Sequence, residues 1–342
     1  MTQQHAAAPC SGCGTEVAAG LLACPVCHRL VHGAELTQLA SAAREAEGRG
    51  DLTAALGTWR KTLDLLPAGT SQRATIDTQM KRLSAMVDGR APKPAGSGKK
   101  AGALATTGAV GAVLLKSKAI LFALLANGKF LLLGLFKLPT LLSMIVYANV
   151  MGGRAAGVPL GIIAAIYVHE IGHVVTLRRY GIEASAPMFI PGFGALVRLK
   201  QYPTDAHEDA RTGLAGPLWG LVASLVALGL GVVFHWDAAL TVAWWSATIN
   251  VFNLIPVWQL DGSRGLHALS STERAIVGAT AIGVALVTQQ AMPATVGVIV
   301  LGRAMVGESH PTGDRGMLAL FLALIVSLPA VAWLATYLGS AG

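Results

Sequence analysis

The sequence is short of charged residues. Lys, Arg, Asp and Glu make up 13% of its 342 residues, whereas soluble domains average about 25%. The shortage is confined to one part of the chain: residues 1–100 hold 12 Lys/Arg and 8 Asp/Glu, while the much longer stretch 101–342 holds 14 and 10. The first third is therefore expected to be a soluble appendage, and the remainder is typical of a membrane protein.

Cysteine is also scarce, and all four cysteines fall within residues 10–27. No disulfide framework can therefore extend across the chain. Two CxxC pairs with this spacing allow four thiolates to converge on one tetrahedral Zn²⁺. We expect a structural zinc in a zinc-ribbon-like module over residues 1–34, with a disulfide pair or a redox CxxC as the alternative. His28 and His32 are expected to flank the site, whose ligands would be Cys10, Cys13, Cys24 and Cys27.

Residues 35–87 show apolar residues at helical spacing, broken at 48–50. The pattern resembles one tetratricopeptide-type helical hairpin, with a third helix at about 72–86. One such repeat cannot bury a solenoid core alone. The segment is therefore expected to pack on the cysteine module or to bind a cytoplasmic protein partner through residues 1–87; a small helical spacer is the alternative. A flexible basic linker follows at 88–103.

Long apolar runs predict a polytopic helical membrane domain over residues 104–342. Residues 104–137 are apolar but carry four lysines, so they are expected to lie along the membrane interface or to re-enter, with one true span as the alternative. Some of the later runs are shorter than the ~20 residues that a spanning helix prefers. Spans are predicted at about 138–152, 157–178, 212–234, 238–256, 275–290, 292–307 and 315–338.

The positions of basic residues predict the orientation of this domain in the cell membrane. All Lys and Arg after residue 138 except Arg154 fall on one side of the predicted spans, which the positive-inside rule makes cytoplasmic. The net charge of +8 then reflects topology and does not indicate a nucleic-acid partner. The N-terminal module is expected in the cytoplasm if 104–137 does not cross, and a reducing compartment keeps its thiols free for metal.

The strongest chemical signal is His169-Glu170-Ile-Gly-His173, within an apolar run. On a helix the two histidines stand on one face and can share a metal, and Glu170 can reach the metal-bound water as a general base. Ionisable groups inside a membrane are costly, so such a cluster is functional by default. The alternative is a pair of core histidines that neighbouring groups satisfy.

A catalytic zinc with three protein ligands keeps a fourth position for water, so a third ligand is needed. Pro256 is expected to end the span before it, and Asp261 follows on the same predicted side as the histidines. An Asp-Gly pair alone usually marks a turn. At matching depth beside the histidines, Asp261 becomes a candidate zinc ligand.

Together these motifs resemble the site-2 protease family of intramembrane zinc metalloproteases, over about residues 138–307. The resemblance implies that His169, His173 and Asp261 bind zinc, that Glu170 is the base and that Asn253 holds the substrate or the oxyanion. Ser263 departs from the pattern, because many members have a second glycine there, and we find no PDZ-like insertion. The matching motifs are His169–His173, Asn253-Leu-Ile-Pro256 through Leu260-Asp261-Gly262, and Gly213-Leu-Ala-Gly216-Pro217.

Two short apolar runs around Pro191-Gly192 predict a β-hairpin, and the segment resembles the membrane-associated hairpin of the family. Its edge could pair with an unwound substrate. Phe193, Gly194 and Gly216, together with Asn253, are expected to contact that substrate, the glycines by permitting close backbone approach.

The sequence thus predicts an intramembrane zinc endopeptidase in the lipid bilayer, with one catalytic and one structural Zn²⁺ and with transmembrane proteins or peptides as substrates. A non-catalytic scaffold that binds partners through its zinc and helical module is the alternative, and a metal transporter is a third hypothesis. Residues 205–209 are expected to form a solvated charged loop rather than a second metal site, and His267 is expected at the surface.

Overall fold

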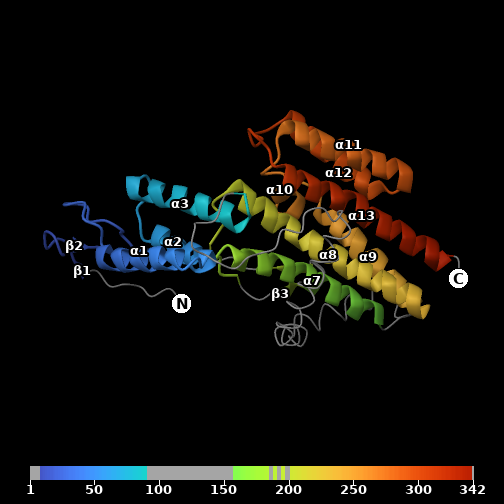
Figure 1. Cartoon of the computed structure of the whole chain (residues 1–342), viewed down its shortest axis with the longest axis horizontal. Coiled ribbons are helices and arrows are strands. Elements are labelled where there is room, and N and C mark those ends of the chain that lie inside the picture. The colour runs from blue at the N-terminus through green and yellow to red at the C-terminus, as the bar shows by residue number, and fades with distance from the viewer. Residues whose placement is uncertain (1–7, 91–156, 185–187, 191–193, 197–200, 341–342) are drawn as a thin grey trace. The chain divides into compact units, whose positions relative to one another are not determined.

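The computed structural model is mostly helical, with four short strands among the residues it describes (Figure 1). The chain divides into two compact units: Met1–Ala101 with Arg178–Glu183, and Gly102–Leu177 with Ala184–Gly342. The linker beyond residue 90, the lysine-containing segment 104–137 and the predicted span 138–152 lie outside the described residues, which are 8–90, 157–184, 188–190, 194–196 and 201–340.

The first unit begins with a small module rich in turns. Strands β1 (Ala8–Pro9) and β2 (Glu16–Val17) pair antiparallel, and a single bridge joins Ala23 to Leu30. The first CxxC pair lies between β1 and β2, and the second lies between the two bridged residues, Ala23 and Leu30. The arrangement fits the predicted zinc-ribbon-like module.

Three helices follow, α1 (Gly33–Gly48), α2 (Leu52–Asp64) and α3 (Ser71–Val87). Asp51 caps α2 by accepting a hydrogen bond from the Ala54 amide, and Thr70 caps α3 through the Arg73 amide, as short polar side chains do at helix starts. The helical hairpin and third helix predicted from the sequence are present. Their shared core contains Ala43, Ala46, Leu52, Ala55, Leu56, Trp59, Leu63, Met80, Leu83 and Met86.

One carboxylate ties the three helices together. Glu47 of α1 accepts a hydrogen bond from Trp59 Nε1 of α2 at 2.6 Å and another from Gln79 Nε2 of α3 at 2.7 Å. Because both donors lie partly buried at the edge of the apolar core, each would lose a partner if this carboxylate were removed.

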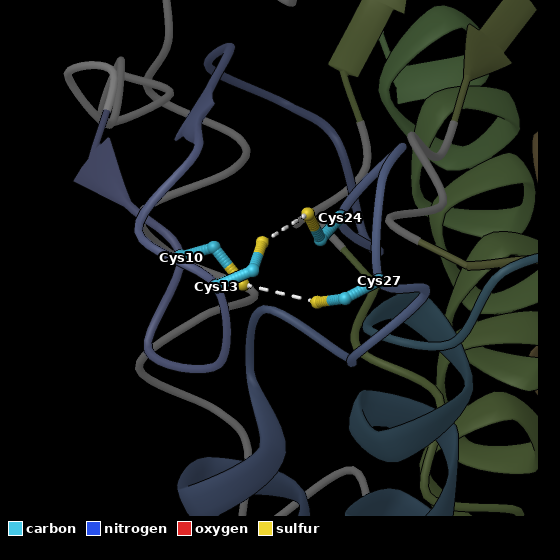
Figure 2. A group of neighbouring side chains, drawn as sticks. All are labelled: Cys10, Cys13, Cys24 and Cys27. Atoms are coloured by element: carbon cyan, nitrogen blue, oxygen red, sulfur yellow. Dashed lines mark hydrogen bonds between the residues drawn. The ribbon is translucent and has the colours of Figure 1, made fainter.

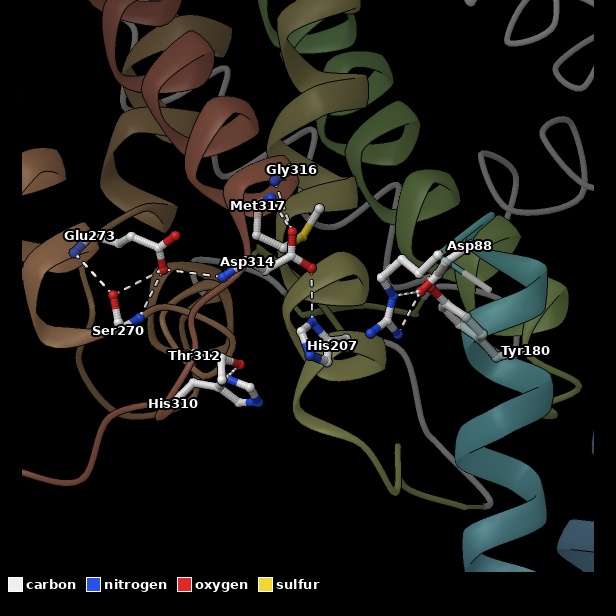
Figure 3. Close-up of polar contacts among 11 residues, drawn as sticks. Asp88, Tyr180, His207, Ser270, Glu273, His310, Thr312, Asp314, Gly316 and Met317 are labelled. Carbon is white, nitrogen blue, oxygen red and sulfur yellow. Dashed lines mark hydrogen bonds and ion pairs between the residues drawn. The ribbon is translucent and has the colours of Figure 1, made fainter. Parts of the chain in front are cut away.

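Residues 178–183 belong to this unit. The side chain of Tyr180 is buried and its hydroxyl donates to Asp88 Oδ1 at 2.5 Å (Figure 3). Arg60 Nε, itself buried, donates to the Tyr180 carbonyl at 3.1 Å. The tyrosine is thus held by both its backbone and its side chain.

The second unit is built on long apolar helices. Helix α8 (Ala206–Phe234) lies against α9 (Asp237–Asn253), and the C-terminal helix α13 (Arg315–Ser340) packs against α8, α9 and α11 (Ser271–Thr288). Helix α11 pairs with α12 (Ala291–Met305). The remaining helices are α7 (Gly157–Arg179), whose last two residues belong to the first unit, and the short α10 (Asp261–Gly265).

Three of the described helices are long and apolar enough to cross a membrane: α7, α8 and α13. The predicted spans at 238–256, 275–290 and 292–307 coincide with α9, α11 and α12, which have 17, 18 and 15 residues. The prediction of a helical membrane protein is confirmed.

The predicted β-hairpin is present as β3 (Met188–Ile190) and β4 (Gly194–Leu196). The strands pair antiparallel, with Phe189 opposite Ala195 and Ile190 opposite Gly194. Residues 191–193, which join the two strands and include Phe193, lie outside the described residues.

The expectation of a solvated loop at 205–209 is wrong. Residues from Ala206 onward form the first turn of α8, and Glu208 is completely buried. His207 Nδ1 lies 2.8 Å from Asp314 Oδ2, at the start of α13 (Figure 3). Burial raises the pKa of Asp314, but hydrogen bonds from the Met317 amide, His207 and the Gly316 amide outweigh it and leave the pKa below its ordinary value.

Replacing Glu47 with alanine is expected to destabilise the three-helix segment by about 1–3 kcal/mol, because the Trp59 and Gln79 donors lose a charged acceptor. Hydrogen exchange of peptides from α1–α3 in the full chain measures this as faster exchange. Glu45→Ala is the matched control, since Glu45 is an exposed residue of the same helix and pairs with exposed Arg49. Equal exchange in the two variants would contradict the linking role of Glu47.

Candidate metal centre

Three buried side chains meet in the second unit. His169 and His173, one turn apart on α7, approach each other with their Nε2 atoms 3.1 Å apart. Asp261, the first residue of α10, places Oδ2 3.1 Å from His169 Nε2 and Oδ1 3.3 Å from His173 Nε2. Each of the three residues is at most 9% exposed. The structure thus brings together the three predicted ligands from two separate helices.

The Nδ1 atoms of both histidines have hydrogen-bond partners on neighbouring helices. His173 Nδ1 lies 2.7 Å from the backbone carbonyl of Thr212 on α8, and His169 Nδ1 lies 2.7 Å from Asn250 Oδ1 on α9. A carbonyl oxygen can only accept, so each Nδ1 carries the hydrogen. In the neutral imidazole each Nε2 then presents its lone pair. Two lone pairs and a carboxylate therefore converge on one point.

This donor set fits a zinc ion. Tetrahedral zinc with bonds of about 2.0–2.1 Å to nitrogen and oxygen holds its ligand atoms about 3.3 Å apart, close to the three separations here. Acceptor atoms this close repel one another unless a metal ion or a shared proton lies between them. Two imidazoles and one carboxylate with a remaining position for water form a donor set typical of catalytic zinc.

The space beside the ligands depends on Gly216 of α8. A Cβ added at this residue would lie 2.2 Å from His173 Nε2 and 2.6 Å from His169 Nε2. The missing side chain therefore leaves room at the atoms that would bind the ion. Gly216 was predicted to contact substrate; its position places it first of all beside the metal ligands.

A second glycine of α8 brings the third ligand close. A Cβ at Gly213 would lie 2.9 Å from the Asp261 carbonyl oxygen and 2.7 Å from Arg264 Cβ, so α10 can approach α8 only where the side chain is absent. Asp209 strengthens this contact: its carboxylate accepts from Arg264 Nε at 2.7 Å and lies 2.6 Å from His267 Nδ1. His267 is exposed, as predicted.

Glu170 follows His169 on α7 and is buried. It is the neighbour in sequence of the ligand His169, one position on along the same helix. A carboxylate beside the open side of a zinc site can exchange protons with bound water. Its position is compatible with the predicted base.

The other predicted residues lie differently. Asn253 is the last residue of α9 and is partly exposed; among the described residues, no hydrogen bond joins it to the three ligands. Gly194 is the first residue of β4. Their assignment to the substrate remains a prediction.

The four cysteines form a second cluster, in the first unit (Figure 2). Cys10 Sγ lies 3.5 Å from Cys27 Sγ, and Cys13 Sγ lies 3.6 Å from Cys24 Sγ, and all four are free thiols. Tetrahedral zinc with Zn–S bonds of about 2.3 Å separates its sulfur atoms by about 3.8 Å. The cluster therefore fits a structural zinc.

The thiols are also poised to ionise unequally. Hydrogen bonds with the hydroxyl and backbone of Thr15 lower the pKa of Cys13 to about 6. The thiolate is the form that binds metal, so this cysteine is ready as a ligand at neutral pH.

Sequence reasoning missed two supporting groups, the Asn250 side chain and the Thr212 carbonyl. Asn250 lies three residues before Asn253, the asparagine to which the motif resemblance pointed. The only sequence signal for Asn250 as a site residue is that it is polar within an apolar helix. The Thr212 carbonyl is a backbone group, so no pattern of residue types in the sequence could predict its role. Both act across helix contacts that the sequence does not display.

Residues 158–241 match the profile of Peptidase family M50. The match includes His169, Glu170, His173 and Gly216, whereas Asp261 lies beyond its end. No solved structure matches the chain.

Three relatives carry zinc metalloprotease names. The chain is 26% identical over 123 residues to "Zinc metalloprotease MJ0392" of Methanocaldococcus jannaschii, covering 34% of this chain and 35% of the relative. It is 26% identical over 233 residues to "Probable zinc metalloprotease EGY2, chloroplastic" of Arabidopsis thaliana, covering 51% and 42%. It is 32% identical over 142 residues to "Putative zinc metalloprotease Rip3" of Mycobacterium tuberculosis, covering 37% and 36%.

The chain spans only about a third to two fifths of the length of these relatives. The matches nevertheless confirm the resemblance to zinc metalloproteases that the motifs predicted. They also support Zn²⁺ as the ion for the His/Asp centre.

Gly216→Ala is expected to remove the zinc of the His/Asp centre, because the new methyl group would occupy the space next to both Nε2 atoms. Zinc analysis of the purified full chain should fall from about two ions to about one, the cysteine cluster retaining its own. The control is Gly229→Ala on the same helix, where an added Cβ meets nothing within 4 Å. Undiminished zinc in Gly216→Ala would exclude this location for the ion.

Proposed function

We propose that this chain is an intramembrane zinc endopeptidase of the site-2 protease type, which hydrolyses peptide bonds of membrane-spanning substrates. One observation carries the proposal: His169 and His173, on an apolar helix long enough to cross a bilayer, converge with Asp261 of the short α10, and Gly216 leaves space beside them. The match to Peptidase family M50 and the zinc metalloprotease relatives support it.

The chemistry follows from the donor set. When bound, Zn²⁺ makes water nucleophilic near neutral pH and polarises the scissile carbonyl. Glu170 would accept the proton of the attacking water and pass it to the leaving amine. Its burial among apolar helices keeps bulk water from competing for that proton. Asn253, at the end of α9, is proposed to hold the substrate or to donate to the developing oxyanion.

The substrate must present an extended segment. A transmembrane helix hides its peptide bonds in its own hydrogen bonds and has to unwind before attack. The β3–β4 hairpin has strand edges of the kind that can accept such a segment by strand addition. Gly194 in β4 and Phe193, the residue before it, are the proposed contacts on that side, with Gly216 beside the two histidine ligands.

The placement of the remaining segments in the cell is part of the proposal. Residues 1–34 and 35–87 form a zinc-ribbon-like and helical module, 88–103 a basic linker and 104–342 the membrane protease domain. The distribution of basic residues favours a cell-membrane location with the module in the cytoplasm, where a soluble protein could bind it.

Glu170→Gln is expected to lower the cleavage rate of a model transmembrane peptide in detergent or bilayers by about 10²–10⁴-fold while leaving zinc content unchanged. The reason is that glutamine keeps the shape of the residue but cannot accept the proton. Glu308→Gln, the same change at an exposed residue, is the control.

Cleavage by Glu170→Gln at the wild-type rate would refute the assigned base. Zinc-loaded wild-type protein that cleaves none of a broad panel of transmembrane peptides would instead favour a non-catalytic scaffold.

A further inference from the structure

The orientation of the Asn250 amide follows from its two partners. Asn250 Nδ2 lies 2.7 Å from the Ser246 backbone carbonyl, which can only accept, so the amide nitrogen must face it. Asn250 Oδ1 consequently faces His169 Nδ1 at 2.7 Å and accepts its hydrogen. The side chain thus assigns the proton of His169 to Nδ1 and leaves Nε2 free for the ion.

The amide has little freedom to turn. Asn250 is 2% exposed, and a Cβ added at Gly220 of α8 would lie 2.1–2.3 Å from its amide atoms. The side chain therefore fits into the space that this glycine leaves. Next to it, Ser224 Oγ donates to the Gly220 carbonyl at 2.8 Å and lies 2.9 Å from Ser246 Oγ. This buried pair is a second polar contact between α8 and α9, separate from the bond between Asn250 and His169.

His173 and His169 are supported differently. The Thr212 carbonyl that holds His173 is part of the α8 backbone, so substitution of a side chain does not remove it. His169 depends on a side chain from another helix. Without it, the buried Nδ1–H would lose its partner, and the ring could rotate or change tautomer.

We propose that Asn250 is a positioning residue for the metal centre: it fixes the tautomer and ring plane of His169 and thereby raises the affinity of the centre for Zn²⁺. This inference rests on the proposed function, since it assumes that His169 is a zinc ligand. Groups that hold the far nitrogen of a ligating histidine typically change metal affinity by about 10–100-fold. Asn250 acts through His169 and is not assigned a contact with substrate.

The test is zinc release from the full-length protein in competition with a chelator. The His/Asp centre and the cysteine cluster should appear as two phases, and Gly216→Ala identifies the first by removing it. In Asn250→Leu and Asn250→Ser the affinity of that phase is expected to fall by about 10–100-fold. Serine is too short to reach His169 but can donate a hydrogen bond to the Ser246 carbonyl within the helix. The serine variant therefore still tests the proposal if the leucine variant fails to fold.

Two further variants separate the hydrogen bond from packing. Asn250→Asp keeps an acceptor for His169 Nδ1 and is expected to retain most of the affinity. Ser246→Ala removes the serine pair but leaves the backbone carbonyl and the Asn250–His169 bond, and should bind zinc like wild type. The cysteine phase should be the same in every variant.

Wild-type affinity in Asn250→Ser, or an Asp variant as weak as the serine variant, would overturn the proposal. Absence of the first phase from the wild-type protein would instead show that the proposed zinc centre itself is wrong.

Discussion

The structure depends on one electrostatic constraint: two imidazole lone pairs and a carboxylate meet inside apolar helices at separations of 3.1–3.3 Å. Such acceptors repel one another, and burial removes the water that would screen them. A cation at their centre turns the repulsion into coordination. The zinc is therefore expected to stabilise the packing of α7 against α10 as well as to supply chemistry, and the surrounding contacts can be understood as holding these groups in place.

Small residues on α8 make that meeting possible. Gly213, Gly216, Gly220 and Ser224 follow one face of the helix, at spacings of three and four. Along this face α8 meets, in turn, the Asp261 backbone, the histidine rings and the Asn250 amide. Small residues are a common way for membrane helices to approach closely. Here the close approach also shapes the metal site, so packing and function are served by the same positions.

Local patterns allowed much of this to be predicted. The His-x-x-x-His spacing on an apolar helix, the CxxC pairs, the hairpin around Pro191-Gly192 and the three helices of the N-terminal unit all depend on neighbours in sequence. What could not be predicted depends on contacts between helices. Asn250 and Asn253 are both polar residues near the end of α9, and only the packing shows which one faces His169. The charged run at 205–209 misled for a related reason, because sequence displays charge but not that Glu208 is buried.

The most direct measurement is zinc K-edge X-ray absorption on full-length protein in which all four cysteines are replaced by serine. One light-atom shell at about 2.0–2.1 Å, with imidazole scattering from two histidines and no sulfur, is the result expected for two histidines, one aspartate and water. Replacing Asp261 with alanine should remove one oxygen ligand or the zinc itself. A spectrum without imidazole scattering, or one that Asp261→Ala leaves unchanged, would contradict the central claim.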